Sequence, residues 1–445
     1  MSSIADTRPA EKELLGHPIG LATLFGTEMF ERFSYYGMRA LLMPFMTASI
    51  AAGGLGYTTA KAGPIYGFYT FGVYGLSIFG GMVADMLLGL YRSVLVGGII
   101  IALGHLAIFI PTVPTFFVGL ALIVIGTSML KPNVSSLVGT LYNKDDQRRD
   151  AGFSIFYMGI NLGAFLAPLI TPVLRTQISW RWGFGAAGVG MILGLIQYVL
   201  GRNYVIGRQA PQTDAAAARE EKTAAPKEPF TRDEWKRIIV IGILFLFSCL
   251  FWAAFEQAGS TLNLFAVRYT DTHVFGLKIE PETLQSVQPL FVIIFAPIFA
   301  AIWTGLGRRE PSSPSKFSLG LIFVGLGMLL LMPAAGVVQR AVGIKVSAWW
   351  LIGVYFLHTV GELCLSPVGL SVVTKLAPSR IVGSMMGVWF SSIALGNLAA
   401  GFIAGEMDKL PLTTIFGAVA VVTVGAGILL LLLVKPIRKL MVGVH

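Results

Sequence analysis

The chain has 445 residues, of which 55% are hydrophobic and only 13% are charged, and its mean hydropathy is +0.74. These values exclude a soluble protein, because soluble domains carry about 25% charged residues. The 33 Lys and Arg residues outnumber the 23 Asp and Glu residues. In a chain of this hydropathy we interpret the excess as membrane topology and expect no nucleic-acid partner.

Apolar runs follow one another along the chain, separated by Gly, Pro and charged residues, at lengths that suit membrane-spanning helices. The first 16 residues are polar and lack the pattern of a cleaved signal peptide, so we expect the first span to act as the signal. We predict an all-α polytopic membrane protein with twelve transmembrane helices, at 19–48, 60–88, 93–111, 115–141, 151–174, 183–201, 236–267, 283–306, 317–336, 347–374, 381–404 and 412–434.

The distribution of Lys and Arg over the connections predicts the orientation, because cytoplasmic loops are enriched in both. If the N-terminus is cytoplasmic, the connections on that side hold 22 of these residues and the opposite connections hold 8. Three more, Arg32, Arg39 and Lys131, lie inside spans. We therefore expect both termini in the cytoplasm and a multi-pass location in the cell's inner membrane.

One connection differs from the others in length and composition. Residues 203–234 are polar and rich in Ala, Gln, Glu and Lys, as in a solvated linker. The linker follows the sixth span and divides the helices into two groups of six, an arrangement typical of transporters whose halves rock against each other. We predict a cytoplasmic segment 1–18, a six-helix bundle 19–202, a cytoplasmic linker 203–234, a second six-helix bundle 235–435 and a cytoplasmic tail 436–445.

Charged residues inside the spans carry the strongest functional signal, since each costs roughly 2.5 to 3.5 kcal/mol at a helix centre. Lys131, Glu256 and Glu362 each lie alone in an apolar context, in the fourth, seventh and tenth spans. Each needs a partner on another helix, so we expect pairing across the bundle. The first span holds a polar stripe at helical spacing, made of Glu28, Glu31, Arg32, Tyr35, Tyr36 and Arg39.

These intramembrane groups comprise three cations and four carboxylates, so one carboxylate is left over. A surplus carboxylate in a low-dielectric cavity tends to hold a proton until a cation approaches, which is the behaviour of a proton-coupling site. The alternative interpretation is a set of structural ion pairs that join helices. An intramembrane enzyme would need a nucleophile or metal-ligand set, and no such motif occurs in the sequence.

The stripe Glu28-x-x-Glu31-Arg32-Phe33-x-Tyr35-Tyr36-Gly37 resembles the signature of the proton-dependent oligopeptide transporters, a branch of the major facilitator superfamily. Four further motifs resemble those of the family in the same order along the chain. They are Gly81-x-x-x-Asp85-x-x-x-Gly89-x-Tyr91-Arg92, Phe156-Tyr157-x-x-Ile160-Asn161-Leu162-Gly163, Phe251-Trp252-Ala253-x-Phe255-Glu256-Gln257 and Gly361-Glu362-x-x-x-Ser366-Pro367.

The resemblance implies the major facilitator fold and a symporter that imports di- and tripeptides by alternating access, driven by protons and without a cofactor or metal. It implies proton coupling by Glu28, Glu31, Arg32, Glu256 and Arg39. It also implies two gating salt bridges, one between Arg39 and Glu256 and one between Lys131 and Glu362. We expect the peptide carboxylate near Arg32 and Lys131, and its ammonium near Glu362, helped by Asn161 and Ser366.

Tolerance of many side chains needs apolar and aromatic walls. By resemblance, the candidates are Tyr35, Tyr36, Tyr69, Tyr74, Trp252, Trp389 and Phe390, with Gln288 as an amide contact. Aromatic residues are also common in helix packing and at the membrane interface, and this structural role is the alternative interpretation for each candidate.

The chain departs from the family in three ways: residues 203–234 cannot supply the two extra helices of many bacterial relatives, Gln288 stands where Asn is common, and Gly67 stands where animal members have His.

A second candidate function remains open within the same fold. A related transporter could move a non-peptide solute such as nitrate or an amine metabolite. Retention of Lys131 and Glu362 beside the Glu28, Glu31 and Arg32 group favours peptides, because a bare anion has little use for a carboxylate that binds ammonium. We expect membrane lipid, protons and peptide as the only partners, and a monomer.

Overall fold

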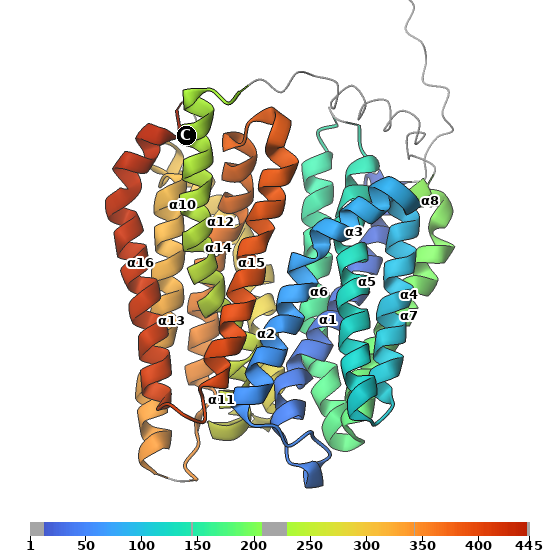
Figure 1. Cartoon of the computed structure of the whole chain (residues 1–445), viewed down its shortest axis with the longest axis vertical. Coiled ribbons are helices and arrows are strands. Elements are labelled where there is room, and N and C mark those ends of the chain that lie inside the picture. Colours follow the sequence, from blue (N-terminus) through green and yellow to red (C-terminus); the bar gives the residue numbers. More distant parts are fainter. Residues whose placement is uncertain (1–12, 144–145, 207–228, 342, 443–445) are drawn as a thin grey trace, which may run out of the picture.

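The computed structural model describes residues 13–143, 146–206, 229–341 and 343–442, and almost all of them are helical (Figure 1). The N-terminal half consists of α1 (Ile19–Thr47), α2 (Thr59–Gly75), α3 (Ser77–Val83), a π-helical turn (Ala84–Leu88), α4 (Gly89–Phe109), α5 (Val113–Thr140), α6 (Arg149–Gln177), α7 (Trp180–Leu200) and the short α8 (Arg202–Ile206). A two-residue hairpin, β1 (Glu13–Leu14) with β2 (His17–Pro18), precedes α1, and a 3-10 turn (Ile50–Ala52) follows it.

The C-terminal half consists of α10 (Arg232–Phe255), the 3-10 turn η3 (Glu256–Gly259), α11 (Thr261–Tyr269), the 3-10 turn η4 (Pro281–Ser286), α12 (Val287–Leu306), α13 (Ser313–Arg340), α14 (Trp349–Leu376), α15 (Val382–Gly405) and α16 (Leu412–Leu440). Single 3-10 turns, Gly307–Arg309 and Ser379–Ile381, follow α12 and α14. Short strands β3 (Thr270–Asp271), β4 (His273–Val274), β5 (Leu277–Lys278) and β6 (Val346–Ser347) lie at one end of this half.

All twelve predicted spans correspond to helical segments. By length and hydropathy alone, ten stretches of the described residues could cross a membrane. The difference has two causes. The charges of α1 lower its hydropathy, and the single stretch Thr59–Phe109 contains two predicted spans, because the chain turns back at Gly89, whose φ is 74° (Figure 1).

Two predicted domain boundaries differ from the observed helix ends. The second bundle begins at Arg232, before the predicted residue 235, because a capping box starts the helix: the Thr231 hydroxyl accepts from the Glu234 N–H at 3.2 Å, and the Glu234 carboxylate accepts from the Thr231 N–H at 2.8 Å. At the other end, α16 continues to Leu440 instead of ending near 435, with Pro436 inside the helix. Most of the predicted linker, 207–228, lies outside the described residues.

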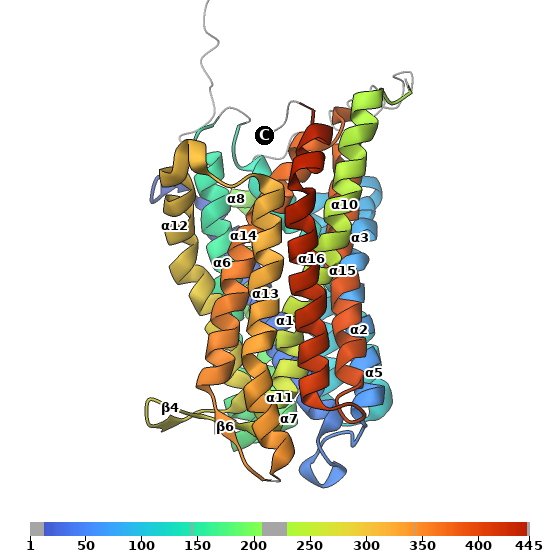
Figure 2. The same cartoon turned by 90° about the vertical axis from the view of Figure 1, so that its left-hand side faces the viewer.

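The two halves stand side by side, with the start of α1 and the end of α16 at the same end of the molecule (Figures 1 and 2). Their main contacts are α2 against α15 and α6 against α12. The α2–α15 contact depends on glycine, since a Cβ at Gly63 would lie 2.4 Å from the Gly401 carbonyl oxygen and one at Gly401 would lie 2.4 Å from the Gly67 Cα. This close approach fixes the two halves against each other near the end of the molecule opposite the termini.

Candidate functional site

The polar stripe of α1 forms a buried charge cluster within the N-terminal half. Arg32 pairs with Glu28, with 3.3 Å between Nε and Oε1, and donates a hydrogen bond to Glu31. All three side chains are at most 2% exposed. Arg32 also lies over the ring of Tyr35, 5.2 Å from the centroid. Two carboxylates therefore share one guanidinium inside the membrane-spanning part of the protein.

Lys131 approaches this cluster from α5. Its ammonium lies over the ring of Tyr74, 3.6 Å from the centroid, and the Tyr74 ring packs edge-on against Tyr35 with centroids 6.2 Å apart. The aromatic residues predicted for the first two spans thus link Lys131 to the Arg32 group. Tyr69 is also buried on α2, and its hydroxyl has no hydrogen-bond partner among the described residues.

Arg39 and Glu256 join the two halves at the centre of the molecule. The Arg39 guanidinium lies 2.7 Å from the Glu256 carboxylate, and its Nε donates to the Tyr66 hydroxyl at 2.9 Å. Glu256 opens the turn η3, where the seventh span is interrupted between α10 and α11. The predicted pairing of Arg39 with Glu256 is confirmed, and the helix break that presents Glu256 adds a feature absent from the prediction.

A glycine in the same turn permits this contact. A Cβ placed on Gly259 would lie 2.0 Å from the Tyr66 hydroxyl oxygen and 2.2 Å from Arg39 Nε. No real Cβ tolerates such distances, so any side chain at 259 would displace Arg39 or Tyr66. The turn η3 therefore positions Glu256 and also leaves the space that Arg39 occupies.

A central pocket of about 50 Å³ lies beside this pair and receives residues from both halves. Tyr36, Arg39 and Asn161 line it from the N-terminal half, and Gln288 and Glu362 line it from α12 and α14. The remaining lining residues are Ala164, Phe255, Ala258, Gln285, Pro289 and Val292. The pocket thus combines the guanidinium of Arg39, the carboxylate of Glu362, the hydroxyl of Tyr36 and the side-chain amides of Asn161 and Gln288 with a small apolar surface.

Several buried polar atoms in and around the pocket have no hydrogen-bond partner among the described residues. The amide nitrogens of Gln285 and Gln288 are two of them, and the Ser366 hydroxyl is a third. The Trp252 indole nitrogen and the Tyr35 hydroxyl also have no hydrogen-bond partner among the described residues. Buried polar groups are normally hydrogen-bonded, so this set is the pattern of a site that a polar ligand or water completes.

The predicted salt bridge between Lys131 and Glu362 is wrong for this conformation. Within the described ranges no ion pair joins Lys131 to Glu362, since Lys131 lies against Tyr74 and Glu362 faces the central pocket. The physical reason is the position of the two halves, whose polar contacts gather near the end opposite the termini. The two side chains are therefore held apart, each on its own half.

Two predicted wall residues lie away from the central pocket. Trp389 is 3% exposed and packs against Phe317 in the core of the C-terminal half, with ring centroids 5.7 Å apart. A Cβ at Gly369 would lie 2.3 Å from the Trp389 ring, so the indole fills that helix crossing. Phe390, the next residue, is 39% exposed. Trp252 lies closer to the central pocket than these two residues do, because its ring packs against Phe255, which lines the pocket.

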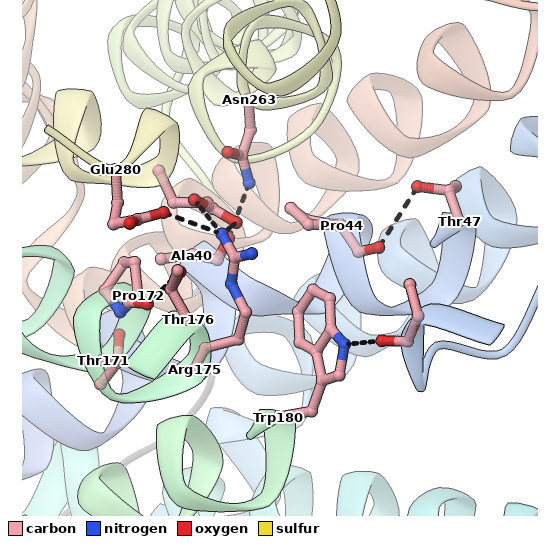
Figure 3. A network of polar contacts seen from close by, with 12 residues as sticks. Ala40, Pro44, Thr47, Thr171, Pro172, Arg175, Thr176, Trp180, Asn263 and Glu280 are labelled. Atoms are coloured by element: carbon pink, nitrogen blue, oxygen red, sulfur yellow. Dashed lines mark hydrogen bonds and ion pairs between the residues drawn. The ribbon is translucent and has the colours of Figure 1, made fainter. Parts of the chain in front are cut away.

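An ion pair that the sequence analysis missed joins the halves near the end opposite the termini. Arg175, at the end of α6, donates to both carboxylate oxygens of Glu282 at 2.7 and 2.8 Å and approaches Glu280 at 3.4 Å. Glu282 is fully buried. Figure 3 shows Arg175 extending toward Glu280, with Trp180 at its side; the guanidinium carbon of Arg175 lies 5.0 Å from the centroid of the Trp180 ring. We call Arg175 with Glu280 and Glu282 the outer latch.

Two further cross-half contacts support the outer latch. Asn263 on α11 donates to the Ala40 carbonyl on α1 at 2.8 Å (Figure 3). Asp408, after α15, accepts from the Thr59 N–H at the start of α2 at 3.1 Å and pairs with Arg268 at 2.8 Å. Partial burial would raise the pKa of Asp408, but hydrogen bonds from Arg268 and Thr59 outweigh it and lower the pKa below its ordinary 3.8. Asp408 is thus ionised at neutral pH and is unsuited to carry a proton.

The sequence contained only a weak signal for these residues. Arg175 and Glu282 lie 107 positions apart, each at the edge of a predicted span. Both lie in predicted connections, where charged residues are ordinary and carry no functional implication. Only the fold brings them together.

A family model described as the POT family matches this chain over residues 91–225 and 222–422. The peptide transporter YePEPT of Yersinia enterocolitica is 37% identical, over 97% of this chain and 97% of its own length. A di-/tripeptide transporter of Lactococcus lactis is 36% identical over 97% and 98%. YclF of Bacillus subtilis, an uncharacterized transporter, is 38% identical over 98% and 97%.

Solved structures agree with these matches. A mutant of the peptide transporter POT in complex with alafosfalin has a TM-score of 0.88 to this chain, with 39% identity over 97% of this chain and 98% of its own. A POT family transporter in complex with 5-aminolevulinic acid has a TM-score of 0.86 and 30% identity, over 96% and 98%. Sequence and structure together cover nearly the entire chain, which therefore has the major facilitator fold and belongs to the POT family of proton-dependent oligopeptide transporters.

Proposed function

We propose that this protein is a proton-coupled symporter that imports di- and tripeptides across the cytoplasmic membrane by alternating access. The observation that carries the proposal is the central pocket, which receives Arg39 and Asn161 from one half and Gln288 and Glu362 from the other. A ligand held by groups of both halves couples its own binding to their relative position. The relatives named as peptide transporters and the alafosfalin-bound homologue support this substrate class.

A zwitterionic peptide suits the distribution of charge around the pocket. In the proposed mode its ammonium binds Glu362, its carboxylate is attracted by Arg32 and Lys131, and the amides of Asn161 and Gln288 contact its backbone. The Ser366 hydroxyl and the Gln288 amide nitrogen are buried without protein partners among the described residues, so both are available to a ligand. Tyr36 and Phe255 supply the apolar part of the wall.

Proton coupling is assigned to the Arg39–Glu256 pair and the Glu28, Glu31 and Arg32 group. A proton that binds Glu256 removes the charge that holds Arg39 across the halves, because a neutral carboxyl attracts the guanidinium far less than a carboxylate does. Loss of that pair lets the halves move. The Glu28, Glu31 and Arg32 group offers a second proton site, since two carboxylates compete there for one guanidinium.

The orientation of the transporter is part of the proposal. The excess of Lys and Arg in the connections at the end of the termini supports a cytoplasmic location for that end. The outer latch would then close the extracytoplasmic side, and this conformation would face inward. The protein acts in this scheme as a monomer within membrane lipid.

Competition in counterflow tests the substrate class. Proteoliposomes preloaded with unlabelled di-alanine and diluted into trace labelled di-alanine should accumulate the label. External dipeptides and tripeptides should inhibit this exchange, whereas nitrate, or di-alanine with its amino group acetylated, should not. Failure of the label to accumulate, together with exchange of labelled nitrate or 5-aminolevulinic acid in liposomes preloaded with that solute, would replace peptides with the alternative solute class.

A further inference from the structure

A short hairpin of the C-terminal half exposes apolar side chains where the transport mechanism gives them no role. Strands β4 and β5 pair antiparallel, with His273 opposite Lys278 and Val274 opposite Leu277. The two turn residues, Phe275 and Gly276, have φ of 49° and 80°. Glycine adopts this conformation freely, but an aromatic residue there is an outlier. The hairpin thus presents a phenylalanine at a position that usually holds Asn or Gly.

The tip of the hairpin is apolar and accessible. Phe275 is 86% exposed and Leu277 is 71% exposed. The side chain of Ile344, in the connection before α14, is 48% exposed, and that of Trp349 is 49% exposed. We call Phe275, Leu277, Ile344 and Trp349 the hairpin patch. Large apolar residues that are exposed together at one end of the molecule indicate an interaction surface.

The position of the hairpin patch indicates what covers it. The ring of Phe275 packs edge-on against that of Trp349, with centroids 5.3 Å apart, and Trp349 is the first residue of the membrane-spanning helix α14. The hairpin is held there by the parallel pairing of β3 with β6 and by the Ala348 N–H, which donates to the Asp271 carbonyl at 3.1 Å. The tip is therefore fixed at the level where a span begins.

The direction of the hairpin adds a second constraint. Figure 2 shows β4 and its turn extending sideways from the bundle, beyond the outline of the helices, at the end opposite the C-terminus. A loop that extends outward along the membrane plane lies over lipid and not over the central pocket. Exposed Lys278 and Lys345 flank the patch, and cations at this depth suit lipid phosphates.

We propose that the hairpin patch is a membrane-interface anchor, with Phe275 and Leu277 inserted among the lipid headgroups and upper acyl chains of the leaflet opposite the termini. Its partner is the bilayer surface, recognised by aromatic and aliphatic side chains beside two lysines. Since the hairpin lies between α11 and η4, next to β3, which pairs with the strand β6 before α14, the anchor ties the C-terminal half to the membrane surface. This inference is independent of the transported solute.

Spin-label accessibility tests the anchor directly. The background replaces Cys249 and Cys364, and single cysteines at Phe275, Leu277 or Lys409 carry a nitroxide label in nanodiscs that hold one protein each. Lys409 lies in the exposed turn between α15 and α16, on the same side of the membrane, and is the matched control. Collision rates with oxygen, which concentrates in lipid, and with a neutral nickel chelate, which stays in water, are then compared.

The proposal predicts that oxygen collisions exceed nickel collisions at 275 and 277 and that the order is reversed at 409. Nickel access at 275 and 277 equal to that at 409 would overturn the proposal, because the hairpin would then project into water. Low access to both reagents would overturn it as well, because protein would cover the tip. Leu277→Cys repeats the measurement at a strand position that does not need a positive φ, and an unchanged melting temperature with a single size-exclusion peak shows that each labelled variant is folded.

Discussion

At the scale of single residues, the two carboxylates Glu256 and Glu362 have different surroundings, which supports the separate roles proposed for them in proton coupling and in substrate binding. Glu256 pairs with Arg39 at 2.7 Å, whereas Glu362 faces the pocket from another helix. A carboxylate that pairs with a cation across the halves is suited to couple proton binding to a movement of the halves, because its protonation weakens that pair. A carboxylate without such a pair is suited to hold an ammonium group.

Glu256→Gln keeps the size of the side chain and removes its charge. We expect the variant to lose proton-driven accumulation of di-alanine while retaining counterflow exchange, because exchange does not require a proton to be taken up or released in each cycle. The matched control is Glu406→Gln, which removes an exposed carboxylate that pairs with Lys409. Normal accumulation by Glu256→Gln would exclude Glu256 as the essential coupling group.

Gly259 provides a steric test of the same contact. Gly259→Ala places a Cβ where Arg39 and the Tyr66 hydroxyl now lie, and overpacking of this kind costs about 1–3 kcal/mol. We expect a large loss of accumulation and a lower melting temperature. Gly242→Ala on α10 is the control, since a Cβ there meets nothing within 4 Å and should leave both measurements unchanged. Equal behaviour of the two variants would show that the packing around Arg39 is not critical.

At the scale of secondary-structure elements, the outer latch joins the end of α6 to the turn η4. The buried Glu282 makes the short contacts with Arg175, and the more exposed Glu280 makes a longer one. Removal of one partner from a fully buried pair costs about 3–5 kcal/mol. The cost of losing the Glu282 charge lies below this range, because the Arg175 side chain is 21% exposed and keeps Glu280 as a partner. An equilibrium between two conformations shifts about tenfold for each 1.4 kcal/mol.

Glu282→Gln should therefore shift the protein toward the conformation in which the latch is open. Double electron–electron resonance between labels on the two halves, at Thr112 and Lys345, should show a longer-distance population that the native chain lacks. Glu280→Gln is the paired control and should change the distance distribution much less. If the two variants give the same distribution as the native chain, the latch does not hold this conformation.

The twelve helices were predictable because long apolar runs separated by charge and turn residues specify membrane spans without knowledge of the fold. The prediction of one span from 236 to 267 missed the break at η3, although the polar stretch Glu256-Gln257-Ala258-Gly259-Ser260-Thr261 interrupts the apolar run there. The outer latch was not predictable, since charge at the edge of a span is ordinary. Sequence patterns define helices well but do not define which helix ends meet.

At the scale of the whole molecule, the arrangement of the halves explains why one predicted salt bridge is present and the other is not. Arg39 and Glu256 lie where α1 and the seventh span cross near the centre of the molecule, and the outer latch closes the end opposite the termini. Lys131 and Glu362 lie on separate halves and face different surroundings. A pair that depends on the conformation cannot be assigned from residue types alone.

Peptide–proton symport is tested by the uptake of labelled di-alanine into proteoliposomes that contain only this protein, with and without an inward proton gradient. We predict accumulation above the external concentration only when the gradient is present, and its collapse when a protonophore is added. Uptake that merely equilibrates, with the same extent with or without the gradient, would contradict proton coupling. Absence of uptake in folded protein that still exchanges another solute would contradict peptide transport.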